Sequence, residues 1–171
     1  VMIYVIQNYD LPLFSSEVGE FDDQQRYILK SFDLAKPMSN FLPGLAGIWG
    51  VPMWAFYVNR GQGITSFGKY SKDSAIAKFV TAEKAYQQTP FTGFRTFLKG
   101  TREGDSNQFH HMPFFPRAFD DPVDKFDRTM KIGSNDMIIE ETAKELALRT
   151  SVQYFIAPQQ AFPALVRTVT F

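Results

Sequence analysis

The chain contains no cysteine among its 171 residues, which excludes disulfides, thiolate metal sites and cysteine nucleophiles. The opening VMIYVIQNYD lacks the basic segment, the long apolar stretch and the small-residue cleavage site of a signal peptide. No apolar run approaches the length of a membrane span. We therefore expect a protein of a reducing compartment, with a cytoplasmic location and no membrane partner.

The chain also lacks an excess of charge, because 18 lysines and arginines balance 18 aspartates and glutamates. Proteins that bind nucleic acid through their overall charge carry a basic excess, so we expect no nucleic-acid partner. The length suffices for one domain with a substantial core. A hydrophobic content of 44 % is typical of globular proteins, so the composition favours an ordinary folded domain.

Motifs of nucleotide binding and of serine nucleophiles are missing as well. Gly61 and Gly63 have no third glycine, no following helix pattern and no Lys-Ser or Lys-Thr beside them. They form neither a phosphate loop nor a dinucleotide fingerprint. No Gly-x-Ser-x-Gly nucleophile elbow occurs. From its residues alone, the chain shows no self-sufficient catalytic apparatus.

Metal and acid–base sites are equally hard to assemble from the sequence. His110 and His111 are the only histidines, and adjacent residues of an extended segment point apart, which is poor geometry for chelation. In a strand, Glu140 and Glu141 would likewise face opposite sides and could not form an acid–base couple. Four aspartates lack the spacing of a calcium loop, so we expect a solvated acidic loop and no metal at Asp120, Asp121, Asp124 and Asp127.

Aromatic side chains are abundant, at 16 % of the residues, and 18 of them are phenylalanines. Most should belong to a core, because aromatic rings are large apolar surfaces. An exposed ring could instead stack on a sugar or another flat partner. Trp49 and Phe114 are the candidates for such exposed rings.

The chain is organised around residues 41–68, FLPGLAGIWGVPMWAFYVNRGQGITSFG, which hold both tryptophans and many glycines. The apolar run over residues 51–58 favours a buried strand, although periodicity alone leaves a buried helix open. Residues 59–63 tolerate the positive φ of a tight turn, and an extended pattern resumes over residues 64–67. Arg60 and Gln62 would then lie at a sheet end, where binding groups are common, although a plain hairpin also explains them.

Short β-branched and aromatic runs predict further strands along the chain. A helix-compatible composition predicts one short helix over residues 81–88, and Gly93 is expected to form a bulge within its strand. The expected strands cover residues 2–6, 27–32, 75–80, 90–99 and 165–171.

Three segments carry expectations about organisation. Residues 140–149 could form a helix, or a connection between two strands. Residues 100–127 are predicted to be a long irregular loop, and loops of this length are usually functional or mobile. Residues 165–171 end as an unfinished strand, so the sheet looks incomplete at its carboxyl end. We expect its partner strand in residues beyond the chain or in another chain.

The stretch PMSNFLPGLAGIWGVPMWAFYVNRGQGITSFG, residues 37–68, resembles the amino-terminal region of carbohydrate phosphorylases of the cellobiose-phosphorylase type, glycoside hydrolase families 94 and 161. The resemblance consists of an aromatic strand, the turn Asn59-x-Gly61-x-Gly63, and then Ser66-Phe67. The FLPG and Asn-Arg-Gly-Gln variants look closer to family 161, which acts on β-1,3-glucan oligosaccharides. The carboxyl-terminal part is similar to sandwich strands of that family, which favours strand–turn–strand over residues 137–156.

The resemblance implies a mainly β fold, an antiparallel β-sandwich of the galactose-mutarotase-like super-sandwich type. Residues 1–171 would form part of one amino-terminal sandwich domain. An α/α toroid, with the catalytic aspartate and the phosphate site, would lie outside this chain. The intact enzyme would be a homodimer in which the sandwich can lend a loop to the partner's acceptor-sugar subsite.

The implied activity is the inverting phosphorolysis of β-glucan oligosaccharides, with β-1,3 linkages favoured and β-1,4 linkages possible. Inorganic phosphate would be the co-substrate, and no cofactor or metal is implied. No catalytic residue is expected within this chain. The alternatives are a non-catalytic carbohydrate-binding sandwich and a dimerisation module. The residues expected to bind substrate are Asn59, Arg60, Gln62, Arg95, His110, His111 and Arg117.

Overall fold

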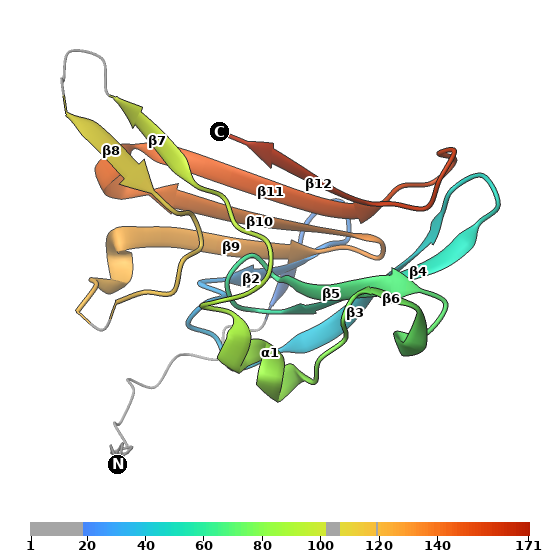
Figure 1. The fold of residues 1–171 in the computed structure, drawn as a ribbon. Coiled ribbons are helices and arrows are strands. Elements are labelled where there is room, and N and C mark those ends of the chain that lie inside the picture. Colours follow the sequence, from blue (N-terminus) through green and yellow to red (C-terminus); the bar gives the residue numbers. More distant parts are fainter. Residues whose placement is uncertain (1–18, 102–106, 119) are drawn as a thin grey trace.

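The computed structural model describes residues 19–101, 107–118 and 120–171, in which two antiparallel sheets face each other as a sandwich (Figure 1). A third, two-stranded sheet projects from one end (Figure 1). The prediction of a mainly β, antiparallel sandwich is thereby confirmed. The strand expected over residues 2–6 lies outside the described residues.

The larger sheet has six strands in the order β1-β2-β9-β10-β11-β12. Alternate residues of β10 are buried, as a strand with one core-facing side requires. Met137, Ile139 and Glu141 therefore share the inner face, whereas Glu140 faces outward, as expected for two adjacent carboxylates. The strands are Glu20–Phe21 (β1), Tyr27–Lys30 (β2), Phe126–Ile132 (β9), Asp136–Ala143 (β10), Leu148–Ile156 (β11) and Leu165–Thr170 (β12).

The smaller sheet has the order β3-β4-β5-β6 and contains the organising stretch. The predicted buried strand over residues 51–58 is confirmed, and so is the hairpin that joins it to the next strand. Gly61 and Gly63 have φ of 55° and 78°, the left-handed backbone that the turn needs and that glycine adopts without a Cβ clash. The strands are Ser39–Ala46 (β3), Val51–Val58 (β4), Ile64–Lys69 (β5) and Ala75–Ala77 (β6).

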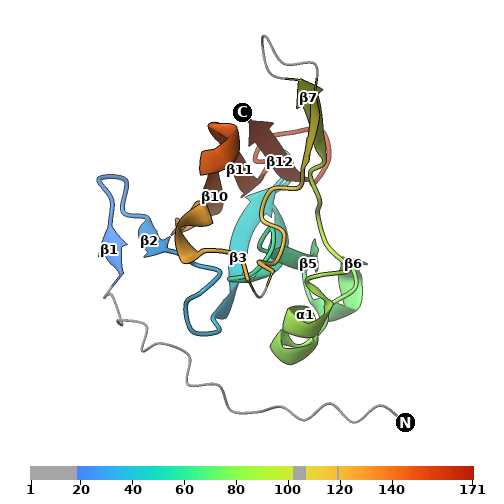
Figure 2. The same cartoon turned by 90° about the vertical axis from the view of Figure 1, so that its left-hand side faces the viewer.

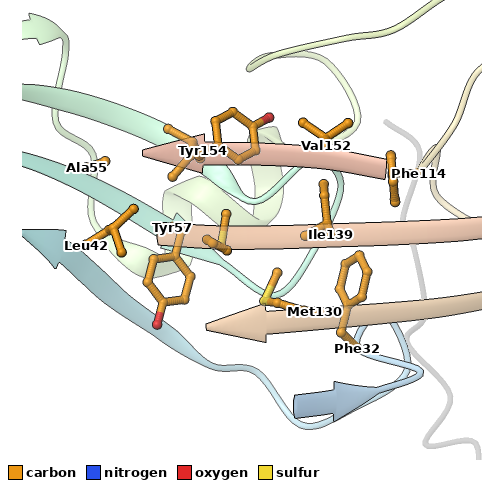
Figure 3. Close-up of a cluster of buried hydrophobic side chains, with 11 residues drawn as sticks. Phe32, Leu42, Ala55, Tyr57, Phe114, Met130, Ile139, Val152 and Tyr154 are labelled. Carbon is orange, nitrogen blue, oxygen red and sulfur yellow. The ribbon is translucent and has the colours of Figure 1, made fainter. Parts of the chain in front are cut away.

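The core fills the space between the two sheets (Figure 3). Leu42, Ala55 and Tyr57 of the smaller sheet face the inner side of the larger one. Three successive cross-strand rows of that inner side run from apolar to charged along the strands. The rows are Ile132–Met137–Tyr154, Met130–Ile139–Val152 and Arg128–Glu141–Thr150.

The outer face of the smaller sheet is covered by the predicted short helix, α1 (Ala82–Gln88), which both views place on the side away from the larger sheet (Figures 1 and 2). Phe56 and Val58 of β4 pack there against Ala85. This second layer of contacts explains why β4 is a continuous apolar run, because both of its faces are buried.

Two sequence predictions about residues 90–127 were wrong in part. Residues 90–97 are not a strand, because the chain turns at the end of α1, where the Gln88 carbonyl accepts hydrogen bonds from two following amides. Gly93 lies in that turn, with φ of 93°. The supposed irregular loop 100–127 contains strand pairing at both of its ends. The two-stranded sheet joins Leu98–Thr101 (β7) to Gln108–His111 (β8), and a short 3-10 helix at Val123–Lys125 (η2) precedes β9.

Residues 140–149 do not form a helix: they comprise the end of β10, a short connection and the start of β11, as the resemblance implied. A single 3-10 turn at Lys144–Leu146 (η3) separates β10 from β11. Another 3-10 turn at Lys72–Ser74 (η1) precedes β6. Within the part of the chain that the structure describes, no helix is long and apolar enough to cross a membrane.

Candidate functional site

The hairpin turn between β4 and β5 is fastened to the segment that follows β2 through Asn59, which is fully buried. Its side-chain amide donates to the carbonyls of Phe32 and Lys36 at 3.0 and 2.9 Å. Its Oδ1 accepts from the Met38 amide at 2.8 Å and from the Tyr86 hydroxyl. Every polar atom of this side chain is thus engaged within the protein, which makes Asn59 an anchor for the site.

Arg60 follows directly and is half-buried. Its guanidinium donates to the carbonyls of Phe32, Ala35 and Asn59 at 3.0, 2.9 and 2.7 Å. It also lies over the Tyr86 ring, 5.6 Å from the centroid. Burial lowers the pKa of the Arg60 guanidinium below its ordinary value, and the nearby Tyr86 and Asp33 oppose that effect.

Asp33 is held between two arginines from distant parts of the chain. Its Oδ2 accepts from Arg117 Nε at 2.7 Å and from Arg128 Nη1 at 2.8 Å. Arg117 also donates to backbone carbonyls at the start of β9, among them that of Phe126 at 3.0 Å. The Oδ1 atom of Asp33 is buried and has no hydrogen-bond partner among the described residues.

Asp33, Arg117 and Arg128 form a charged cluster, and Glu141 extends this cluster into the sandwich. Its two carboxylate oxygens bind Arg128 Nε and the Phe114 amide at 2.7 Å, and His111 Nε2 at 2.8 Å. Burial by itself would raise the pKa of Glu141. The contact with His111, the charge of Arg128 and the Phe114 amide outweigh it, so the pKa lies below its ordinary value.

The ring of Phe126 packs against the cations of this cluster. The guanidinium of Arg128 lies 4.8 Å from the ring centroid, and that of Arg117 lies 5.5 Å from it. The imidazole of His111 stacks on the same ring at 6.1 Å. Cation–π contacts of this kind hold the arginine side chains in place beside the cluster.

Beside these residues is a cavity of about 310 Å³. Ligand pockets in proteins begin near 300 Å³, so it has room for a small molecule. Arg60 and Arg117, two of the predicted binding residues, line it together. The complete lining is Asp33, Leu34, Arg60, Gly61, Tyr86, Thr89, Pro90, Phe114, Pro116, Arg117 and Arg128.

The other predicted residues lie apart from the cavity lining. Gln62 is buried and bonds to Thr96, and its Oε1 accepts from Arg167 of β12. Arg95 donates to the backbone carbonyl of Thr89 at the end of α1. His110 is exposed, whereas His111 reaches the cavity only through Glu141 and Arg128.

Asp33, Arg128 and Glu141 were not selected as site residues from the sequence. Arg128 and Glu141 could have been found, because each is a charged residue at a core-facing position of a strand whose residues alternate between buried and exposed. Asp33 lies in the turn after β2, where an aspartate is common and carries no signal of a binding site. Across the described residues, no group of three histidine or carboxylate side chains could hold a metal ion.

Searches against protein-family models, curated proteins and solved structures found no match to this chain.

Proposed function

We propose that the chain is part of the amino-terminal β-sandwich of an inverting glycoside phosphorylase that cleaves β-glucan oligosaccharides with phosphate. The observation that carries the proposal is the motif of residues 37–68. It supplies the β3–β4 hairpin, the anchored turn at Asn59 and the strand β5. The antiparallel sandwich and the strand–turn–strand over β10 and β11 agree with the same proposal.

In the proposed reaction, phosphate attacks the anomeric carbon from the face opposite the leaving sugar. A carboxylic acid in the toroid, outside this chain, protonates the glycosidic oxygen. The products are α-glucose 1-phosphate and a shortened oligosaccharide. The sandwich contributes no reacting group. Asn59 and Arg60 instead hold the hairpin turn rigidly against residues 32–38, so the surface beside the turn is preorganised.

The test is a phosphorolysis assay on protein purified from its source, combined with an intact mass. Laminari- and cello-oligosaccharides are supplied with phosphate, and glucose 1-phosphate is detected. We expect a mass above 19.6 kDa and a product that forms only when phosphate is present. Release of free glucose without phosphate would indicate a hydrolase. A mass of 19.6 kDa without any product would contradict the proposal.

A second candidate function is non-catalytic carbohydrate binding, which the exposure of Trp49 favours. Its side chain is 88 % exposed at the tip of the β3–β4 hairpin. That tip is paired with the β11–β12 connection through a bridge between Gly47 and Pro158, and the two loops lie side by side (Figure 1). Phe162 of the second loop is also exposed. Exposed rings on a fixed support can stack on sugar faces.

Phe114, the other ring considered for this role, is only 1 % exposed, so its expected exposure was wrong.

Tryptophan fluorescence tests this second candidate. Titration with laminari-oligosaccharides should shift the emission of Trp49, and Trp49→Ala should abolish binding. Trp54, which is half-buried and donates to the Ser71 carbonyl, supplies the matched control variant Trp54→Phe. Binding that survives Trp49→Ala would contradict a stacking role for this ring.

A further inference from the structure

The cavity carries positive charge that the protein leaves unbalanced. Arg117 and Arg128 share the carboxylate of Asp33, and Arg128 also pairs with Glu141. Arg60 forms no ion pair with any described residue, and its partners are backbone carbonyls. Three guanidinium groups therefore line a cavity whose network contains two carboxylates. Asp33 acts on Arg60 electrostatically but already binds two other arginines, so the half-buried Arg60 favours a further anion beside it.

Hydrogen-bond donors are also left over at the cavity. A guanidinium has five N–H groups. The hydrogen bonds of Arg60 engage its Nη1 and Nη2 atoms, so its Nε has no partner among the described residues. Arg128 uses Nε, Nη1 and Nη2 once each, which leaves two N–H groups free within the described part of the chain. Planar arrays of such donors match the oxygens of phosphate.

The remaining lining suits a small organic group attached to that anion. Tyr86, Phe114 and Pro116 provide apolar and aromatic wall. The unpartnered Oδ1 of Asp33 accepts hydrogen bonds only, so it is complementary to a hydroxyl donor. Asp33, Arg117 and Arg128 have side chains that are 10 % exposed or less, so the polar part of the site is built into the fold.

We propose that this cavity binds the phosphate monoester of a small hydroxylated compound, of which a sugar phosphate is the simplest example. The phosphate lies against Arg60 and the free N–H groups of Arg128, and a hydroxyl is directed toward Asp33. The proposal concerns a binding site within the sandwich and does not depend on phosphorolysis. It would stand if the phosphorylase assay failed, because it is tested by binding alone.

Calorimetry with three probes tests the proposal on the 171-residue chain: inorganic phosphate, α-glucose 1-phosphate and glucose. We expect glucose 1-phosphate to bind more tightly than phosphate, and glucose to show no measurable binding. Equal affinity for glucose and glucose 1-phosphate would overturn the proposal in favour of a neutral sugar site. An absence of binding by both phosphate probes would overturn it outright.

Two arginine variants localise the binding. Arg60→Gln should weaken binding of glucose 1-phosphate by about tenfold or more, the effect expected from losing a charge-assisted contact. Arg149→Gln removes a 65 % exposed arginine on the outer face of β11, outside the cavity lining, and should leave the affinity unchanged. Equal weakening by both variants would show a non-specific charge effect and refute the site.

Amide chemical shifts of the unsubstituted protein provide a readout that does not depend on the folding of a variant. Glucose 1-phosphate should shift the amides of Gly61, Thr89 and Phe114, which line the cavity. The indole N–H of Trp49, at the opposite sandwich end, should not move. Shifts confined to residues outside the cavity lining would refute the proposal.

Discussion

Glu141 lies directly opposite Arg128 on the neighbouring strand, and its Oε2 accepts a hydrogen bond of 2.7 Å from the Arg128 Nε. The two side chains are 1 % and 2 % exposed. An ion pair thus replaces apolar packing at one end of the inner face. Such a pair requires each partner to remain satisfied, because an isolated buried charge is costly.

The first prediction concerns the loss of this charge. Glu141→Gln keeps the shape of the side chain but leaves Arg128 without one of its two counter-charges. We expect a loss of roughly 3 kcal/mol in the free energy of unfolding, as for other broken buried pairs. Urea unfolding measures it. Glu20, which is 69 % exposed in its pair with Lys30, supplies the control, because Glu20→Gln should change stability by less than about 1 kcal/mol. Equal effects would contradict the role given to the buried pair.

The second prediction is a pH dependence. The pKa of Glu141 in the fold lies below its ordinary value of 4.5, so the folded state favours the ionised form. Its stabilising contribution is complete above pH 4.5 and is lost as the pH falls through the lower pKa of the folded state. Unfolding midpoints between pH 3 and 7 should therefore decline less steeply in Glu141→Gln than in the unsubstituted protein. Parallel curves would argue against a perturbed Glu141.

The third prediction concerns the turn anchor. Asn59→Ala removes hydrogen bonds to two backbone carbonyls and one amide in the segment after β2. The Phe32 carbonyl keeps Arg60 and the Met38 amide keeps the Tyr86 hydroxyl, so the Lys36 carbonyl is the group that loses its partner. A buried group left unpaired costs about 1–3 kcal/mol, so we expect a loss in that range. The melting temperature reports it. Asn40 is exposed on β3, and Asn40→Ala should lower the melting temperature far less.

The fourth prediction lies at alkaline pH. Burial raises the pKa of Tyr154 to about 12, although its contact with Arg167 acts in the opposite direction. The neutral phenol is favoured in the fold, so its contribution is complete below the ordinary value of 10.0 and is lost as the pH rises toward 12. Tyr154→Phe should lose less stability than the unsubstituted protein between pH 10 and 11.5. Tyr70→Phe, on the surface, should behave like the unsubstituted protein.

The sequence allowed the β4–β5 hairpin to be predicted because a continuous apolar run and a glycine turn are strong local signals. The β7–β8 pair was missed for the opposite reason. Its strands, LKGT and QFHH, have little hydrophobic alternation and are defined by pairing with each other. Such pairing depends on which segments meet, which local pattern does not record.

The candidate site was predictable only in part. Arg60 was selected because it lies in a glycine turn at a sheet end, and Arg117 because it lies in the predicted long irregular loop. Arg60 and Arg117 line the same cavity. This could not be predicted, because the cavity also needs Asp33 and Arg128, which are far apart in the sequence and meet only in the fold. The alternation of β9 could have indicated Arg128, since Arg128 and Met130 lie on the same face.

The pairing of β2 with β9 has a consequence for how the chain folds. Strands β9 to β12 are consecutive and can assemble through short connections. By contrast, Ile28 pairs with Lys131, so β2 can join the sheet only after a very long loop has closed. Contacts of this separation slow folding. We therefore expect the carboxyl-terminal meander to assemble first and the cavity to form last, because Asp33, which follows β2, meets Arg128 only when β2 docks.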